Sequence, residues 1–221
     1  MDYSKLYPEF KTHKVFVHGP GAPAYMAMFK RMGFGSTPDV DEASIICFTG
    51  GEDVNPTLYG ESNLLVGGRE VSGINPKRDD RDAFVYGIGL SNEARMVGIC
   101  RGAQFLNVMN GGRMWQHVNG HAGGAHNLVD TFTGEVVKVT STHHQMMRPA
   151  DDGTIIAVAR ESSYKLADPD EWHIESDGVE DDVEVVWYPG QKCLCFQPHP
   201  EFSDADDCLD YFAQLMERYI T

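Results

Sequence analysis

The chain has 221 residues, of which 42% are hydrophobic and 23% charged, a balance that excludes a disordered or fibrous protein. Its formal net charge of -15 repels phosphates and anionic lipid headgroups, so we expect neither nucleic acid nor a membrane as a partner. Five cysteines without a disulfide-like spacing favour the cytoplasm, and no apolar run has the length of a signal peptide or a membrane span.

In the first half of the chain, predicted strands alternate with predicted helices. Short apolar runs that precede a turn or a helix predict strands at 14–18, 44–49 and 95–99. Helical spacing and start signals predict helices at 24–32, 77–94 and 103–110. This alternation predicts an α/β fold, a three-layer sandwich with a mostly parallel central sheet, as a single domain over residues 1–221.

In the second half of the chain, the sequence predicts shorter strands and one final helix. The strands are expected at 135–140, 154–159, 183–188 and 192–196. The helix at 204–220 is amphipathic, with one apolar face formed by Leu209, Phe212, Leu215 and Met216. The segment 168–184 holds nine acids and no Lys or Arg, so we expect a solvated loop or hairpin there, with a docking surface as the alternative.

Cys100 lies on the turn between the strand at 95–99 and the helix at 103–110. Gly98 and Gly102 flank it, which lets strand and helix approach closely in a strained elbow. The free N–H groups at the start of the helix supply the local positive potential that a thiolate needs. A buried, inert thiol is the alternative interpretation, and the same interpretation suits the other four cysteines.

A possible base for Cys100 follows the strand at 192–196. His199 and Glu201 are two residues apart, and Pro198 and Pro200 keep this segment extended. Alternation along an extended chain therefore places both side chains on one side. The pattern predicts a Cys100–His199–Glu201 triad, in which the carboxylate orients the imidazole and the imidazole pairs with the thiolate.

Thr49-Gly50-Gly51 follows another strand end of the same sheet. Glycine there allows a backbone N–H to turn toward a developing oxyanion. We expect the N–H groups of Gly51 and Arg101 to form the oxyanion hole.

These motifs, taken together and in order, resemble the class I glutamine amidotransferase superfamily, and within it the gamma-glutamyl hydrolase branch of peptidase C26 type. The resemblance covers residues 48–202 and includes the runs 50–56, 98–107, 143–145 and 198–202. It implies a flavodoxin-like fold, the triad and oxyanion hole named above, and substrate contacts from Gln104, His143 and His144. One departure is Pro198, which stands where the family commonly has Trp.

The resemblance implies cleavage of a gamma-glutamyl amide through a thioester. Glutamine is the first substrate, with ammonia passed to a separate synthetase or amide-acceptor enzyme. The alternatives are a stand-alone hydrolase of larger gamma-glutamyl amines and an inactive scaffold. We expect neither half-reaction to need a metal or an organic cofactor.

Several other polar residues have less specific patterns. His117, His121 and His126 with the pair His143-His144 fit no standard zinc spacing, so no metal site is predicted, and His126 is expected with the pair at the cleft mouth. Arg81 and Asp82 are interpreted as an exposed ion pair on a helix.

Overall fold

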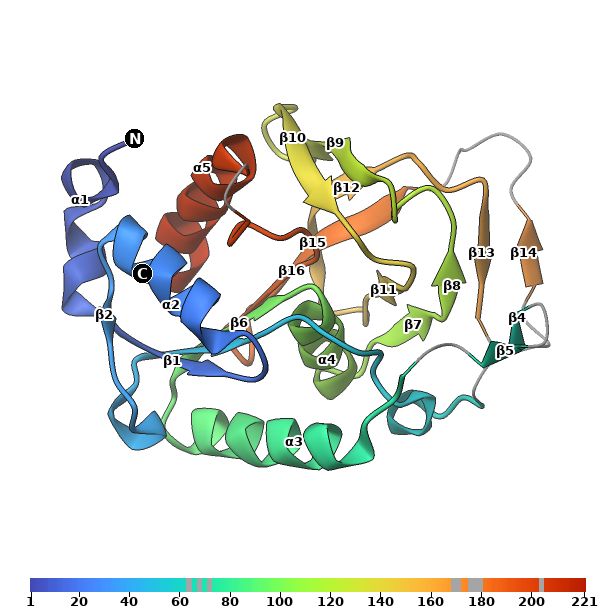
Figure 1. The fold of residues 1–221 in the computed structure, drawn as a ribbon, viewed down its shortest axis with the longest axis horizontal. Helices are drawn as coiled ribbons and strands as arrows, with labels where there is room; N and C mark the ends of the chain where they lie inside the picture. The colour runs from blue at the N-terminus through green and yellow to red at the C-terminus, as the bar shows by residue number, and fades with distance from the viewer. Residues whose placement is uncertain (63–64, 67–68, 71–72, 168–171, 175–180, 203–204) are drawn as a thin grey trace.

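The computed structural model describes residues 1–62, 65–66, 69–70, 73–167, 172–174, 181–202 and 205–221. Its centre is a sheet in which nine strands of the described chain take part, in the order β10-β9-β12-β15-β16-β6-β3-β1-β2 (Figure 1). One half is parallel and comprises β1 (Lys14–His18), β2 (Gly35–Ser36), β3 (Ile45–Phe48), β6 (Arg95–Ile99) and β16 (Cys193–Phe196). The other half is antiparallel and comprises β9 (Gly124–Asp130), β10 (Val136–Ser141), β12 (Thr154–Ala159) and β15 (Asp182–Tyr188).

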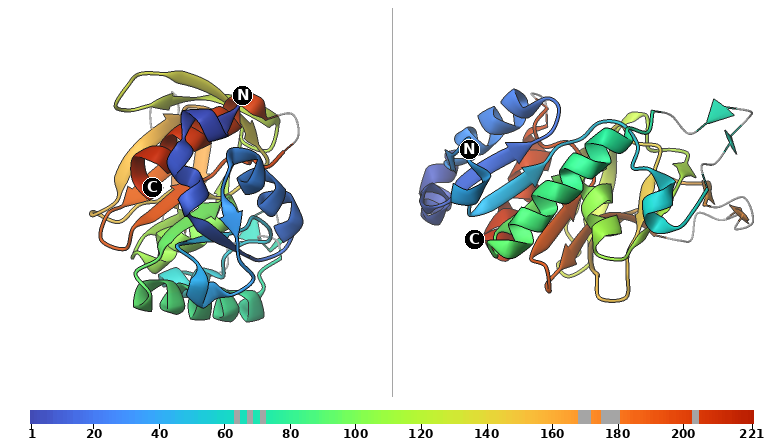
Figure 2. Two further views of the ribbon diagram at one scale, coloured as in Figure 1. Left: turned by 90° about the vertical axis from the view of Figure 1, so that its left-hand side faces the viewer. Right: turned by 90° about the horizontal axis from the view of Figure 1, so that it is seen from below.

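Helices cover both faces of the parallel half. One face packs against α1 (Tyr3–Leu6), α2 (Ala22–Met32) and α5 (Asp206–Leu215), and the other against α3 (Pro76–Ser91) and α4 (Arg101–Met109) (Figures 1 and 2). The strand β3 shows why: Ile45 and Cys47 join the core under α2 and α5, whereas Ile46 and Phe48 join the core under α3 and α4. Because side chains alternate across a strand, an entirely apolar strand needs cover on both faces.

Short elements lie beyond the main sheet. They are a pair β7 (Arg113–Trp115) and β11 (Met146–Arg148), a group β8 (His117–Val118), β13 (Tyr164–Leu166) and β14 (Trp172–Ile174), and a pair β4 (Leu65–Val66) and β5 (Arg69–Glu70). Single turns of helix occur at Pro8–Thr12, Val40–Glu42, Pro56–Tyr59 and Met216–Ile220. No helix in the described ranges has both the length and the apolar character needed to cross a membrane.

The three-layer α/β/α prediction is confirmed, and every strand and helix predicted above has a counterpart within a few residues. The buried face of α5 is also as predicted. The helix at 77–94 is present as α3, but its large apolar residues Phe84 and Leu90 are exposed, and it buries Arg78, Asp79 and Asp82 together with Val85 and Tyr86. The strand β9 was not predicted, because the glycines at its start indicated a loop.

The acidic segment 168–184 divides in the structure. Residues 168–171 and 175–180 lie outside the described residues. At its end, however, the prediction of a solvated loop is wrong, because Asp182 and Glu184 belong to β15 and are fully buried.

Candidate active site

Cys100 lies at the sharp turn between β6 and α4. Its backbone has φ 53° and ψ -115°, a left-handed conformation that a non-glycine residue adopts only under strain. Its own N–H donates to the carbonyl of Phe196 in β16, which ties the turn to the neighbouring strand. The thiol is thus held at the N-terminus of α4, where free N–H groups favour negative charge.

Two glycines make this turn possible by close approach. A Cβ on Gly98 would lie 2.3 Å from the backbone of Gly102, and a Cβ on Gly102 would lie 2.1 Å from the carbonyl oxygen of Phe48. Any larger side chain at either position would collide with backbone. Gly98 and Gly102 therefore allow the close approach of strand and helix that was predicted around Cys100.

His199 and Glu201 lie beyond the end of β16, which is next to β6 in the sheet. The Nδ1 atom of His199 is 2.7 Å from Oε1 of Glu201, so the carboxylate orients the ring. Burial lowers the pKa of His199, but hydrogen bonding to Cys100 and Glu201 outweighs it and raises the pKa to about 10. The ring is therefore an imidazolium at neutral pH.

Two further residues fix the position of His199. The hydroxyl of Thr140, in β10, accepts a hydrogen bond from the His199 N–H at 2.8 Å and donates one to its carbonyl at 3.0 Å. The ring of Phe202 stacks on the imidazole, with centroids 4.6 Å apart and planes within 7°. His199 is consequently held through its backbone and its ring face as well as through Nδ1.

The loop after β3 faces the elbow. Gly51 has φ 143°, and a Cβ there would lie 2.3 Å from the Arg78 guanidinium. That guanidinium donates to the carbonyls of Thr49 and Gly50 at 2.8 and 3.0 Å, while the Gly50 N–H donates to the Tyr25 hydroxyl at 3.0 Å. These bonds hold the peptides that lead to Gly51 in one orientation.

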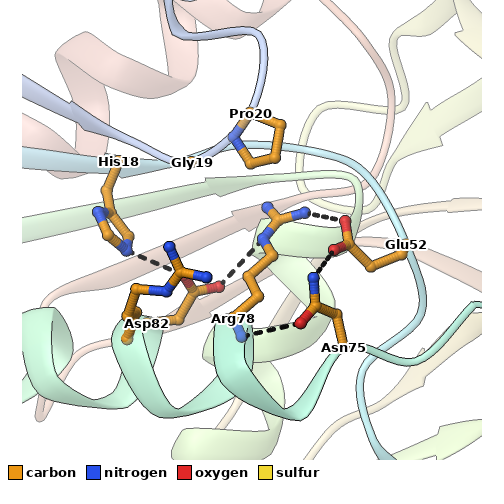
Figure 3. A pocket seen from close by; sticks show the side chains of 8 residues that line it. His18, Gly19, Pro20, Glu52, Asn75, Arg78 and Asp82 are labelled. Atoms are coloured by element: carbon orange, nitrogen blue, oxygen red, sulfur yellow. Dashed lines mark hydrogen bonds and ion pairs between the residues drawn. The ribbon is translucent and has the colours of Figure 1, made fainter.

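Arg78 is itself fixed by its neighbours on the rim of a cavity of about 320 Å³ (Figure 3). It donates to Glu52 at 2.6 Å, and Asn75 donates to the other oxygen of Glu52 at 2.8 Å. Partial burial raises the pKa of Glu52, but hydrogen bonds from its own backbone, Asn75 and Arg78 outweigh this effect and lower the pKa to about 2. The ion pair is therefore retained across the whole physiological range.

A second cavity, of about 290 Å³, opens at the thiol. Cys100, Gly51 and Gln104 line it together with Asp53, Gly73 and the segment 142–145. Gln104 is buried, and its amide donates to the carbonyl of Gln145 and to the side chain of Gln197. Of the residues predicted for the site, Cys100, Gly51, Gln104, His143 and His144 line this cavity. His199 is hydrogen-bonded to Cys100 and Glu201, but neither it nor Glu201 belongs to the cavity lining.

The three histidines expected at the cleft mouth differ in their surroundings. His144 lines the cavity, with Nε2 3.2 Å from Asp53, whose carboxylate raises the pKa of the ring. His143 lines it too, but its Nδ1 faces the Gln145 carbonyl at 2.9 Å and its Nε2 faces Glu184 at 3.4 Å. The expectation is wrong for His126, which is buried in β9 and is not part of the cavity wall.

The model of the family described as Peptidase C26 matches residues 37–201, about three-quarters of the chain. The chain belongs to the Peptidase C26 family. Residues 37–201 include Cys100, His199 and Glu201, as well as the loop carrying Gly51.

Curated relatives of this Peptidase C26 chain carry glutamine amidotransferase names. A "putative glutamine amidotransferase" of Mycobacterium tuberculosis is 27% identical over 74% of this chain and 52% of its own length. A "putative glutamine amidotransferase-like protein" of Lactococcus lactis is 28% identical over 65% of this chain and 64% of its own length. The chain therefore spans about half to two-thirds of these relatives.

Solved structures share the fold at low sequence identity. A glutamine amidotransferase from Thermotoga maritima superposes with a TM-score of 0.59 at 13% identity, covering 93% of this chain and 84% of that one. The PurLQS structure from the same organism gives 0.58 at 17% identity, covering 94% and 98%. Family and fold together place the chain in the class I glutamine amidotransferase superfamily.

The sequence did not predict one feature of this Peptidase C26 site, the buried ion pairs that Arg101 forms next to Cys100. The guanidinium of Arg101 binds both Asp79 and Asp82, and Asp82 also lies 2.9 Å from Nε2 of His18 (Figure 3 shows the contact with His18). The interpretation of Arg81 and Asp82 as an exposed pair is wrong, because only Arg81 is exposed. The i, i+3 spacing of two acids in α3 was the available signal, but it does not tell a buried helix face from an exposed one.

Proposed function

We propose that this chain is a cysteine-dependent hydrolase of gamma-glutamyl amides, with glutamine as substrate and a glutamyl thioester as intermediate. The observation that carries the proposal is Cys100 on a strained elbow, paired with a His199 imidazolium that Glu201 orients. Five free, buried cysteines suit the reducing cytoplasm that we propose as its location.

In the first half-reaction, the Cys100 sulfur would attack the side-chain amide carbon of the substrate. The N–H groups of Gly51 and Arg101 would donate to the oxyanion that forms. The C–N bond then breaks, and His199 gives its proton to the departing nitrogen, so ammonia leaves and a thioester remains.

In the second half-reaction, His199 would act as the base. It would take a proton from a water molecule, whose oxygen attacks the thioester carbon between the same two N–H donors. The C–S bond breaks, glutamate is released, and the thiolate–imidazolium pair is restored.

Asp53 and His144 support a substrate that carries an amino-acid head. One carboxylate oxygen of Asp53 is buried without a hydrogen bond, and Asp53 lines the cavity that opens at Cys100. This unpaired oxygen suits an α-ammonium group. His144, whose pKa is raised by the other oxygen of Asp53, is charged more readily and suits an α-carboxylate. Gln104 would contact the glutamyl chain between this pair and Cys100.

A separate synthetase is the partner that we propose for the ammonia. A further relative, the carbamoyl phosphate synthase small chain of Escherichia coli, is 28% identical over 59% of this chain and 31% of its own length. Its name describes one chain of a synthase. By analogy, the nitrogen released here would pass to another polypeptide.

The test is glutamate release from glutamine and from a panel of larger gamma-glutamyl amines. We expect wild-type protein to release glutamate and Cys100→Ala to be folded and inactive. A Cys100→Ala variant that still released glutamate would refute the assignment. Faster release from a larger amine would favour the stand-alone hydrolase, which the branch-level motifs also suit.

Incubation with an electrophilic glutamine analogue, followed by mass spectrometry of the protein, distinguishes an active enzyme from an inactive scaffold. Wild-type protein should gain one adduct at Cys100, whereas a scaffold should gain none. A glutaminase rate that rises on adding a candidate synthetase would support the partner.

A further inference from the structure

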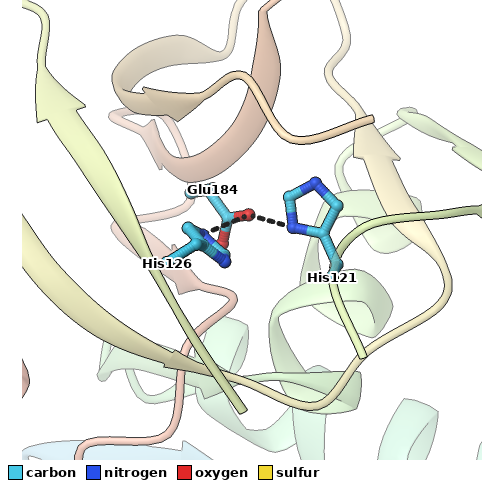
Figure 4. Close-up of side chains that lie close together, drawn as sticks. All are labelled: His121, His126 and Glu184. Atoms are coloured by element: carbon cyan, nitrogen blue, oxygen red, sulfur yellow. Dashed lines mark ion pairs between the residues drawn. The ribbon is translucent and has the colours of Figure 1, made fainter. Parts of the chain in front are cut away.

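Three histidines and one glutamate converge in the interior, and of these only His143 also lines the cavity at Cys100. His121 lies in the loop before β9, His126 in β9, His143 in the loop after β10, and Glu184 in β15. His121 and Glu184 have no exposed surface, and His126 and His143 are 7% and 4% exposed. In Figure 4, the side chains of His121, His126 and Glu184 point toward one another.

One oxygen atom is common to the contacts in this cluster. Oε1 of Glu184 lies 3.1 Å from Nδ1 of His121, 3.3 Å from Nε2 of His126 and 3.4 Å from Nε2 of His143. All four atoms are buried, yet none of them has a partner in hydrogen-bond geometry. Leaving a buried polar group unsatisfied costs about 1–3 kcal/mol, so four at one point require an explanation.

In two of the rings, the contact made by the nitrogen that points away from Glu184 shows where the proton lies. Nε2 of His121 lies 2.9 Å from Asp182, and Nδ1 of His143 lies 2.9 Å from the Gln145 carbonyl. Each partner accepts a hydrogen bond, so these nitrogens carry the protons. In the neutral form of each ring, the nitrogen that faces Glu184 then carries the lone pair, which is the arrangement of metal-binding histidines held by outer carboxylates and carbonyls.

Three of these residues lie close enough together to share one metal ion, because one ligand atom each of His121, His126 and Glu184 lies within 4.8 Å of the other two. Ligand bonds of about 2.0–2.1 Å to zinc place neighbouring ligand atoms about 3.3–3.4 Å apart. The distances of 3.1, 3.3 and 3.4 Å from Glu184 fall close to this value. We propose that His121, His126 and Glu184 bind a divalent transition-metal ion, with zinc as the first candidate, and that a shift of the His143 ring brings its Nε2 in as the fourth ligand.

The burial of all four ligands indicates a structural ion, since a catalytic site keeps an open position. It would join β9, β15 and both loops that lead into and out of the β9–β10 pair. His143 belongs to the segment 142–145 that lines the substrate cavity, and Thr140, which holds His199, lies three residues before it. The ion would therefore hold the wall of the active site in place.

The test begins with metal content and binding in the complete wild-type chain. We expect about one zinc ion per chain after purification without chelators, measured by mass spectrometry of the elements. Cobalt added to metal-stripped protein should give the visible absorption of a four-coordinate ion. Zinc should also raise the melting temperature of stripped protein.

Variants distinguish this cluster from the other histidines. Glu184→Gln and His126→Gln should abolish stoichiometric binding, and Asp182→Asn should weaken it by about 10–100-fold. His117→Gln is the matched control, because His117 contacts the Tyr164 hydroxyl outside the cluster, and it should bind like wild type. Asp182→Asn retains all four ligands, so it remains informative if a ligand variant does not fold.

The competing arrangement is a metal-free ion-pair cluster. Burial lowers the pKa of His121, but Asp182 and Glu184 raise it to about 9, so a protonated ring could bridge the two carboxylates. Wild-type protein that binds neither zinc nor cobalt at micromolar concentration would establish that arrangement and overturn the proposal. Equal binding by His126→Gln, Glu184→Gln and His117→Gln would overturn it as well.

Discussion

Glu201→Gln tests whether the carboxylate acts on His199 by charge rather than by shape. The amide is nearly isosteric and its oxygen can still accept the Nδ1–H over the 2.7 Å contact, so the ring keeps its orientation. What is lost is a buried, charge-assisted hydrogen bond, worth about 1.5–3 kcal/mol. At about 1.4 kcal/mol per pKa unit, the pKa of His199 should fall by about 1–2 units from its value of about 10.

The sign of the pH effect follows from the raised pKa. The imidazolium form is complete at low pH and is lost as pH rises through the pKa, so it sets the alkaline limb of kcat/KM for glutamate release. The limb should lie near pH 10 in wild-type protein and near pH 8–9 in Glu201→Gln. At pH 9, a pKa of about 8.5 leaves only about a quarter of the rings charged, against about nine-tenths in wild type.

The measurement is the pH profile of kcat/KM for both proteins, with circular dichroism to show that both are folded. Glu217→Gln is the control, because Glu217 is exposed on the last turn of the chain and should leave the profile unchanged. Coincident alkaline limbs for wild type and Glu201→Gln would refute the electrostatic role.

Two predictions concern the framework of the site. Gly102→Ala should lower the free energy of unfolding by about 3 kcal/mol, because its Cβ would meet the Phe48 carbonyl, whereas Gly87→Ala, in open space on α3, should raise it by up to about 1 kcal/mol. Equal midpoints in urea for these two variants would contradict the close approach. Thr140→Val should cost about 2–4 kcal/mol and reduce glutamate release, since it removes both hydrogen bonds to the His199 backbone, while Thr140→Ser retains them. A Val variant as stable and active as the Ser variant would show that these bonds do not position His199.

The sequence alone determined the elbow and its partners. Gly98 and Gly102 around Cys100, between an apolar strand and a helix, are a local pattern whose geometry follows from backbone sterics. His199 and Glu201 could be assigned because they too follow a strand, and parallel strands end at a common edge. Local periodicity and turn residues are sufficient for such inferences.

Only the tertiary structure decided which charged residues are buried together. Arg101 and Asp82 meet because α3 packs beside α4, and Asp82 in the sequence is indistinguishable from an exposed helix acid. Glu184 lies in an acidic stretch that reads as solvated, yet β15 carries it to His121, His126 and His143. That meeting depends on the strand order β10-β9-β12-β15, which long-range packing sets and no local pattern encodes.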